Sequence, residues 1–265
     1  MQNHHGEWIW YELLTSDADA AQAFYEAVVG WTVGQFPGEE EPGAGMDYRI
    51  LTGAGGAGAG GLTRLPDGAP MQPGWHGYIG VHDVDAAVAA IEEAGGQVLM
   101  PALTMEGVGR MAFVADPQGV RFYVMKGASE SPSTAYQRNA LGHCAWNELV
   151  TADDTAALHF YGTHFGMVKD GAMPMGEMGD YSFLRSAHAQ EPFGAVLRQP
   201  PGAPARWSFY FRVPDVDAAA EMVRAQGGQV IMGPMDVPGG ERIVVCVDPQ
   251  GASFGLVSGQ QAREG

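Results

Sequence analysis

The sequence predicts an α+β protein built from four βαβββ units, and two internal repetitions lead to this prediction. The segment from Trp10 to Trp31 recurs from Trp146 to Met167, and 10 of its 22 residues are identical in the two copies. A second set, Trp75, Asp83 and an Asp116-Pro-Gln-Gly motif, recurs as Trp207, Asp215 and Asp248-Pro-Gln-Gly. Such self-similarity indicates one supersecondary unit used several times. We therefore expect two domains with curved, mostly antiparallel sheets, each made of two βαβββ units, numbered here as repeats 1 to 4.

The first repeat opens with aromatic and aliphatic residues that predict a strand over residues 7–15. A helix over 18–29 should follow, because Asp17 can accept hydrogen bonds from its first turn and Gly30 can end it. Three more strands are expected at 31–36, 48–52 and about 60–65.

The second repeat should follow the same order, with a helix over 85–94 that ends at Gly95-Gly96. Its strands are expected at 75–81, 97–101, 110–115 and 120–125. The Asp116-Pro-Gln-Gly119 motif joins the last two strands, because proline presets φ and glycine accepts the positive φ of a tight turn. Repeats 3 and 4 should begin at about His143 and Arg206.

These boundaries place a first domain at 1–127, with repeats at 6–66 and 74–127. A serine-rich segment without hydrophobic periodicity, 128–138, is expected to be a linker. The second domain should span 139–260, with repeats at 139–200 and 205–258, followed by a tail at 261–265. Each domain is long enough to bury its own core.

The charge balance favours a protein that acts on small molecules. Acidic residues outnumber basic ones 31 to 14, for a net charge of -17, so nucleic acid and anionic membranes would be repelled. No apolar run approaches a membrane span, no signal-peptide pattern opens the chain, and Cys144 and Cys246 form no disulfide framework. We expect a cytoplasmic monomer or homodimer with a small-molecule ligand.

Several motifs together resemble a known superfamily. These are the W-x-E-L openings at Trp10 and Trp146, the FY pair at Phe24, the D-V-D helix starts and the D-P-x-G hairpins. They are similar to the vicinal oxygen chelate superfamily, which includes glyoxalase I, bleomycin-resistance proteins and extradiol dioxygenases. The resemblance covers the chain outside the linker and tails, and implies glyoxalase/bleomycin-resistance/dioxygenase-type domains. It leaves the reaction open, because this scaffold carries unlike chemistries.

The resemblance also implies where metal-using members hold a divalent ion. The corresponding residues are Trp10, His76 and Tyr123, with a fourth position near Gly60 to Leu62, and the second-half counterparts of the first three are Trp146, Ser208 and Gly255. An indole has no lone pair for a metal, whereas such a site needs three or four protein donors. We therefore expect no metal and no other cofactor. An alternative is a displaced metal site in which Glu12 pairs with His76.

Without a metal, the first domain presents the richer set of side chains. Strand alternation suggests that Glu12, His76 and Tyr123 face a common cavity, with Glu12 as general base and the other two stabilising charge on a substrate oxygen. The expected ligand-binding residues are Trp10, Tyr78, Arg121, Trp146, Glu148 and Tyr210. A structural alternative is that Glu12 and Glu148 pair with arginines such as Arg121 or Arg212, or cap backbone groups, and serve the fold.

The leading functional prediction is a metal-independent site in the first domain that binds or transforms a hydrophobic or aromatic metabolite. Whether the protein is an enzyme stays open; an enzyme would perform lyase, isomerase or dioxygenase-like chemistry. Two alternatives remain: a metal-dependent lyase or dioxygenase of the glyoxalase I type with displaced ligands, and a non-catalytic module that sequesters a drug or metabolite or binds a partner.

Overall fold

The computed structural model describes residues 3–35, 47–66, 68–69, 71–200 and 202–259. Repeat 1 forms β1 (Trp8–Thr15), α1 (Ala18–Val29), β2 (Thr32–Gln35), β3 (Tyr48–Thr52) and β4 (Gly58–Arg64). Repeat 2 forms β5 (Gly74–Gly80), α2 (Val84–Glu93), β6 (Gln97–Met105), β7 (Gly109–Ala115) and β8 (Arg121–Gly127). Phe36, the last residue of a predicted strand, and the predicted tail at 261–265 lie outside the described residues.

The second half of the chain repeats this order with one additional short helix. Repeat 3 forms β9 (Cys144–Thr151), α3 (Asp154–Phe165), β10 (Met167–Pro174), the 3-10 helix η1 (Gly176–Met178), β11 (Asp180–Ser186) and β12 (Gly194–Arg198). Repeat 4 forms β13 (Arg206–Arg212), α4 (Val216–Ala225), β14 (Gln229–Val237), β15 (Glu241–Val247) and β16 (Ser253–Gly259).

The strands form two eight-stranded mixed sheets, which confirms the predicted fold class. The strand orders are β2-β3-β4-β1-β5-β8-β7-β6 and β10-β11-β12-β9-β13-β16-β15-β14. In the first sheet β1 pairs with β4 and β5 with β8 in parallel, whereas β7 pairs with both β6 and β8 in antiparallel fashion. The predicted strand at 97–101 is longer than expected, because β6 stays paired with β7 as far as Met105.

Local sequence signals explain where the helices begin and the hairpins turn. Each of the four α-helices in the described residues follows an aspartate whose carboxylate accepts a backbone N–H of the first turn, as Asp17 does from Ala20 at 3.0 Å. In the Asp116-to-Gly119 hairpin, Gly119 has a φ of 82°, the positive value that favours glycine. None of the helices in the described part of the chain is long and apolar enough to span a membrane.

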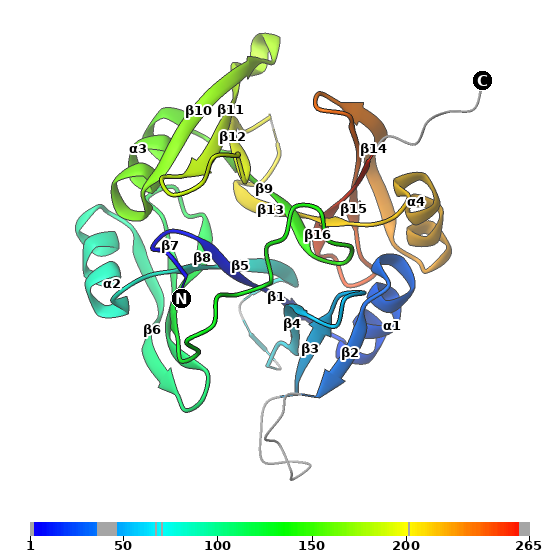
Figure 1. Cartoon of the computed structure of the whole chain (residues 1–265), viewed down its shortest axis with the longest axis horizontal. Helices are drawn as coiled ribbons and strands as arrows, with labels where there is room; N and C mark the ends of the chain where they lie inside the picture. Colours follow the sequence, from blue (N-terminus) through cyan, green and yellow to red (C-terminus); the bar gives the residue numbers. More distant parts are fainter. Residues whose placement is uncertain (1–2, 36–46, 67, 70, 201, 260–265) are drawn as a thin grey trace. The chain divides into compact units, whose positions relative to one another are not determined.

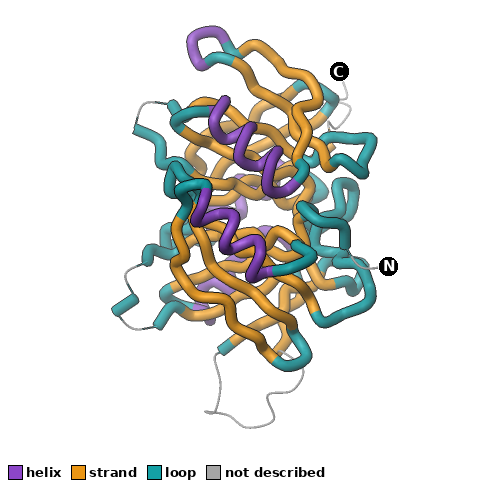
Figure 2. The backbone as a smooth tube through the Cα atoms, turned by 90° about the vertical axis from the view of Figure 1, so that its left-hand side faces the viewer, coloured by secondary structure: helices purple, strands orange, loops and turns teal. Residues whose placement is uncertain are grey.

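The chain folds into two compact units, each assembled from three separate segments. Unit 1 comprises residues 1–10, 76–133 and 146–208, and unit 2 comprises 11–75, 134–145 and 209–265. In unit 1, α2 packs on β6, β7 and β8 and lies beside α3 (Figures 1 and 2). In unit 2, α4 packs on β14, β15 and β16 and lies beside α1 (Figure 1). Each unit therefore combines helices from both halves of the sequence.

A buried tryptophan, tyrosine and aspartate form the same hydrogen-bonded set in each unit. In unit 2 these residues are Trp75, Tyr25 and Asp248; in unit 1 they are Trp207, Tyr161 and Asp116. The indole N–H donates to the tyrosine hydroxyl, which in turn donates to the carboxylate. The other carboxylate oxygen accepts two backbone N–H groups of its own hairpin. These sets connect residues that lie far apart in the sequence.

Candidate functional site

Three of the predicted site residues, His76, Tyr78 and Tyr123, lie together on one face of the sheet in unit 1. His76 and Tyr78 are two residues apart on β5, and Tyr78 is the register partner of Tyr123 on the parallel strand β8. The two tyrosine rings stack with centroids 4.1 Å apart and an interplanar angle of 4°. Trp10, also in unit 1, is partly buried on β1.

A fourth ring, that of Phe113 on β7, extends this stack. Its centroid lies 4.4 Å from that of Tyr123, so Tyr123 is in contact with a ring on each of its faces. His76 approaches Phe113 edge to face, at 5.1 Å and 82°. Phe113 is not among the site residues that the sequence predicts. The predicted hairpin implies its position, because a turn at 116–119 makes Phe113 the strand partner of Tyr123.

The electrostatic surroundings of His76 keep its imidazole neutral at physiological pH. Burial and the nearby positive charge of Arg121 lower the pKa of His76 to about 4. A neutral imidazole donates one hydrogen bond and accepts one. Arg121 begins β8 with an exposed side chain. The rings of Tyr78, Phe113 and Tyr123 on this face of unit 1 are buried, whereas the Arg121 side chain on the same face is exposed.

Glu12 lies in unit 2 and is 5% exposed. Its register partner on the parallel strand β4 is Gly61, and a Cβ at Gly61 would collide with the hydroxyl of Tyr48. Register partners on neighbouring strands direct their side chains to the same face. The Tyr48 hydroxyl is therefore placed on the sheet face to which Glu12 points, and the glycine makes room for it.

The equivalent glutamate of the second copy, Glu148, ends a chain of two hydrogen bonds within unit 1. Trp146 Nε1 donates to the Tyr181 hydroxyl at 2.8 Å, and that hydroxyl donates to Glu148 Oε2 at 2.8 Å. Both predicted residues, Trp146 and Glu148, thus meet at a tyrosine to which the sequence does not point. A carboxylate with such a donor is stabilised when it is partly buried.

Tyr48 and Tyr181 occupy equivalent places in the two copies. Tyr48 lies on β3 opposite Thr63 of β4, and the neighbouring pair Ile50 and Gly61 corresponds to Phe183 and Ala195 in the second half. The presence of this tyrosine in both copies could have been used to identify it from the sequence. An ungapped comparison misses it, because the copies of this tyrosine are 133 residues apart whereas the tryptophans are 136 apart.

The remaining predicted residue, Tyr210, lies in unit 2. A Cβ at Gly255 would collide with the Tyr210 ring, so this ring covers the position that Tyr123 has in the first copy. Arg212 donates to Glu241 and to the backbone carbonyl of Arg138. The two copies therefore share a backbone but place different side chains at equivalent positions.

The side chains at the implied metal positions do not fit a divalent-ion site with three or four protein donors. In unit 1 these positions hold the Trp10 indole, the His76 imidazole and a Tyr123 phenol stacked between two rings. An indole cannot coordinate, and a phenol ligates as a phenolate, which is disfavoured near neutral pH. Within the described residues, no three His, Cys, Asp or Glu side chains gather in an arrangement that could hold a metal ion.

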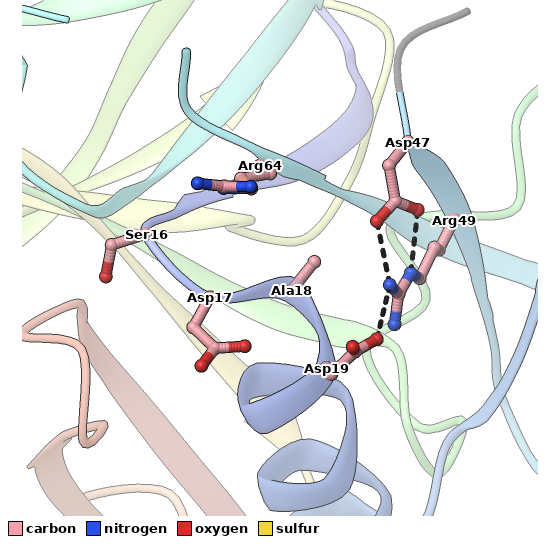
Figure 3. Close-up of a pocket in the computed structure, with 7 residues that line it drawn as sticks. All are labelled: Ser16, Asp17, Ala18, Asp19, Asp47, Arg49 and Arg64. Carbon is pink, nitrogen blue, oxygen red and sulfur yellow. Dashed lines mark hydrogen bonds and ion pairs between the residues drawn. The ribbon is translucent and has the colours of Figure 1, made fainter. Parts of the chain in front are cut away.

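A polar pocket of about 290 Å³ lies in unit 2 beside the N-terminus of α1 (Figure 3). Its lining residues are Ser16, Asp17, Ala18, Asp19, Asp47, Arg49 and Arg64, and none of them is a predicted site residue. The Arg49 guanidinium pairs with Asp19 at 2.6 Å and with Asp47 at 2.7 Å. Because Arg49 is already paired with two carboxylates, the pocket is a weaker candidate for a hydrophobic ligand than the aromatic face of unit 1.

The chain matches the family model described as the Glyoxalase/Bleomycin resistance protein/Dioxygenase superfamily at residues 8–124 and 140–256. It is 37% identical over 251 residues to "Putative glyoxylase CFP32" of Mycobacterium bovis, covering 94% of this chain and 93% of that protein. It is 32% identical over 275 residues to "Anthracycline biosynthesis protein DnrV" of Streptomyces peucetius, covering 97% of this chain and 93% of that protein.

Two solved structures share the fold at low sequence identity. The Mn(II)-bound glyoxalase from Novosphingobium aromaticivorans has a TM-score of 0.63 and 19% identity, covering 97% of this chain and 83% of that chain. An extradiol ring-cleaving dioxygenase from B. fuscum has a TM-score of 0.66 and 15% identity, covering 97% and 72%. Likeness at this identity speaks for the fold and leaves the reaction open.

Proposed function

This chain belongs to the Glyoxalase/Bleomycin resistance protein/Dioxygenase superfamily, and we propose that its first half binds or transforms a hydrophobic or aromatic small molecule without a metal ion. The observation that carries the proposal is the ring cluster of Tyr78, Phe113 and Tyr123 around His76 in unit 1. Aromatic walls with a few polar groups are typical of small-molecule sites.

The chemistry of this face suits a flat, apolar ligand. Aromatic rings favour offset-stacked and edge-to-face neighbours, and His76 adds one directional hydrogen-bonding group. The name of the relative DnrV also supports a flat aromatic ligand, since anthracyclines are planar aromatic compounds. An aromatic ligand is therefore the first class to test.

As an enzyme, the protein would use Glu12 as general base. As a binding protein, it would hold the same ligand without turnover. The Glu12→Gln variant separates these two roles, because it removes the base but keeps a side chain of nearly the same shape. Product formation that is lost while binding persists supports the enzyme, and unchanged turnover contradicts the role of Glu12.

Ligand binding is tested directly with 1,4-dihydroxyanthraquinone on protein kept in EDTA. Quenching of tryptophan fluorescence should saturate, and the melting temperature should rise with ligand concentration. The His76→Ala variant should weaken binding, whereas Ser208→Ala, the change at the equivalent position of the second half, should leave it unchanged. Absence of saturable binding, or equal effects of the two variants, would contradict the proposal.

A metal-dependent lyase or dioxygenase is the second candidate. It is favoured by His76, which occupies a ligand-equivalent position, and by the fold shared with an Mn(II)-bound glyoxalase. Elemental analysis of untagged protein purified without chelator distinguishes the candidates. Stoichiometric Mn, Fe, Ni or Zn that is lost in His76→Ala would overturn the metal-independent site, and a metal-free protein that binds the anthraquinone would support it.

A further inference from the structure

Arg121 differs from the other arginines that the structure describes. Of the eleven that the described residues include, eight form ion pairs, and Arg206 donates to Ser208. Arg64 also has a partner. Among the described arginines, Arg121 is therefore the one that forms neither an ion pair nor a hydrogen bond. With 31 acidic against 14 basic residues, acidic partners are plentiful, so an unpaired guanidinium is unexpected.

The strand register places Arg121 on the aromatic face of unit 1. Tyr78 of β5 pairs with Tyr123 of β8, and continuing this parallel register by two residues brings His76 beside Arg121. On the other side of β8, Ala115 pairs with Arg121 and Phe113 with Tyr123. The guanidinium and the imidazole are therefore neighbours at one end of the ring cluster.

The same face of these three described strands contains no carboxylate. Alternation gives it His76, Tyr78 and Gly80 from β5, Met111, Phe113 and Ala115 from β7, and Arg121, Tyr123 and Met125 from β8. Arg110 lies on β7 but belongs to the opposite face, where it pairs with Asp85 at the start of α2 at 2.5 Å. Among the described residues of these three strands, the aromatic face thus has one positive charge and no carboxylate.

We infer that the ligand of this face is an aromatic compound with an anionic oxygen, a carboxylate or an acidic phenol, which Arg121 binds and His76 orients by a hydrogen bond. This inference rests on the proposed function and specifies in addition that the ligand is negatively charged. Arginine forms paired, charge-assisted hydrogen bonds with such oxygens. Because burial and Arg121 hold the pKa of His76 near 4, the imidazole contributes an N–H group and Arg121 contributes the charge.

The second copy of the repeat loses both groups together. Ser208 replaces His76 and Ser253 replaces Arg121, while the backbone register of β13 and β16 repeats that of β5 and β8. The fold therefore does not require either side chain. Their joint presence in the first half supports a role in binding an anionic ligand.

The experiment compares 2-naphthoate with methyl 2-naphthoate, which have the same ring system and differ in charge. Dissociation constants come from tryptophan fluorescence or calorimetry at pH 7 and constant ionic strength. The wild-type protein should bind the acid at least about tenfold more tightly than the ester. Arg121→Gln should abolish this preference and leave ester binding unchanged, and Arg121→Lys should retain part of it.

Arg110→Gln is the matched control, because it removes the same charge from the same sheet but from the opposite face. It should leave the preference for the acid intact. An effect as large as that of Arg121→Gln would show that the preference depends on the net charge of the protein and not on the position of Arg121, and would overturn the inference. Equal binding of acid and ester would also overturn it while the proposed function stands. If neither compound nor the anthraquinone binds, both the inference and the proposed function fail.

Discussion

The hydroxyl of Tyr25 donates a hydrogen bond of 3.0 Å to Asp248, which lies 223 residues later in the sequence. Tyr161 makes the equivalent bond to Asp116 at 3.1 Å. In unit 2 this bond joins repeat 1 to repeat 4, and in unit 1 it joins repeat 3 to repeat 2. The tyrosine of the FY pair and the aspartate of the D-P-x-G hairpin are thus partners, although the sequence presents them as separate local motifs.

Replacing Tyr25 by phenylalanine should lower the free energy of unfolding by about 1–3 kcal/mol, because Trp75 Nε1 and Asp248 Oδ2 both lose a buried hydrogen-bond partner. Urea denaturation monitored by tryptophan fluorescence measures this loss. Glu26→Gln, an exposed change on the same helix, should stay within about 0.5 kcal/mol of the wild type. A Tyr25→Phe protein as stable as the wild type would contradict a stabilising role for this bond.

The Asp248 carboxyl should make stability fall as the pH rises above its ordinary pKa. Burial raises the pKa of Asp248 above 3.8, against the opposing effect of its hydrogen-bond donors. Between 3.8 and this raised value the folded state binds more protons than the unfolded state, so the slope of unfolding free energy against pH is negative. Asp248→Asn removes the titrating group and should flatten that slope.

Urea denaturation at a series of pH values from 4 to 7 tests this dependence. Glu92→Gln serves as the control, because this exposed side chain on α2 can be changed without disturbing a buried group. Its stability curve should run parallel to that of the wild type. An Asp248→Asn curve with the wild-type slope would show that another group causes the dependence.

The Gly61→Ala substitution should destabilise unit 2, because the added Cβ collides with the Tyr48 side chain. Overpacking of this kind costs about 1–3 kcal/mol. Gly34→Ala on β2 is the matched control, since nothing lies within 4 Å of a Cβ at that position. In a double-mutant cycle, Tyr48→Ala should relieve much of the cost of Gly61→Ala, and strict additivity would contradict the predicted collision.

Tyr181 and Glu148 should be energetically coupled, because the tyrosine hydroxyl donates to the carboxylate at 2.8 Å. The cycle consists of the wild type, Tyr181→Phe, Glu148→Ala and the double variant, each unfolded in urea. A coupling energy of at least about 0.5 kcal/mol is expected for a direct contact within one hydrogen-bond network. Tyr181→Phe combined with Ser253→Ala, a change in the other unit, should instead be additive.

Local structure was predictable because its causes lie within a few residues. Asp17 caps a helix that runs over 18–29 as predicted, and Gly119 adopts the positive φ of the predicted hairpin. The end of β6 was not predictable in the same way, because its last residues are held by the register with β7. That register depends on β7, and the residues of β6 by themselves do not show how far β7 pairs with them.

The candidate site was predictable in part. Strand alternation groups His76 with Tyr78 and Arg121 with Tyr123, since side chains alternate faces with a period of two. The stack of Tyr123 between Tyr78 and Phe113, and the contact of Tyr181 with Glu148, depend on pairing between strands and on side-chain rotamers. The catalytic role of Glu12 stays a prediction.

By itself, the sequence determined the four repeats, their capped helices, their hairpins and the residues that differ between copies, such as His76 and Ser208. Only the tertiary structure decided that Tyr25 binds Asp248 and Tyr161 binds Asp116, because an identical motif in each copy does not specify which copy supplies its partner. It likewise decided that Arg121 forms no ion pair with the described residues. Charge pairing depends on distances in space, and residues far apart in the chain set those distances.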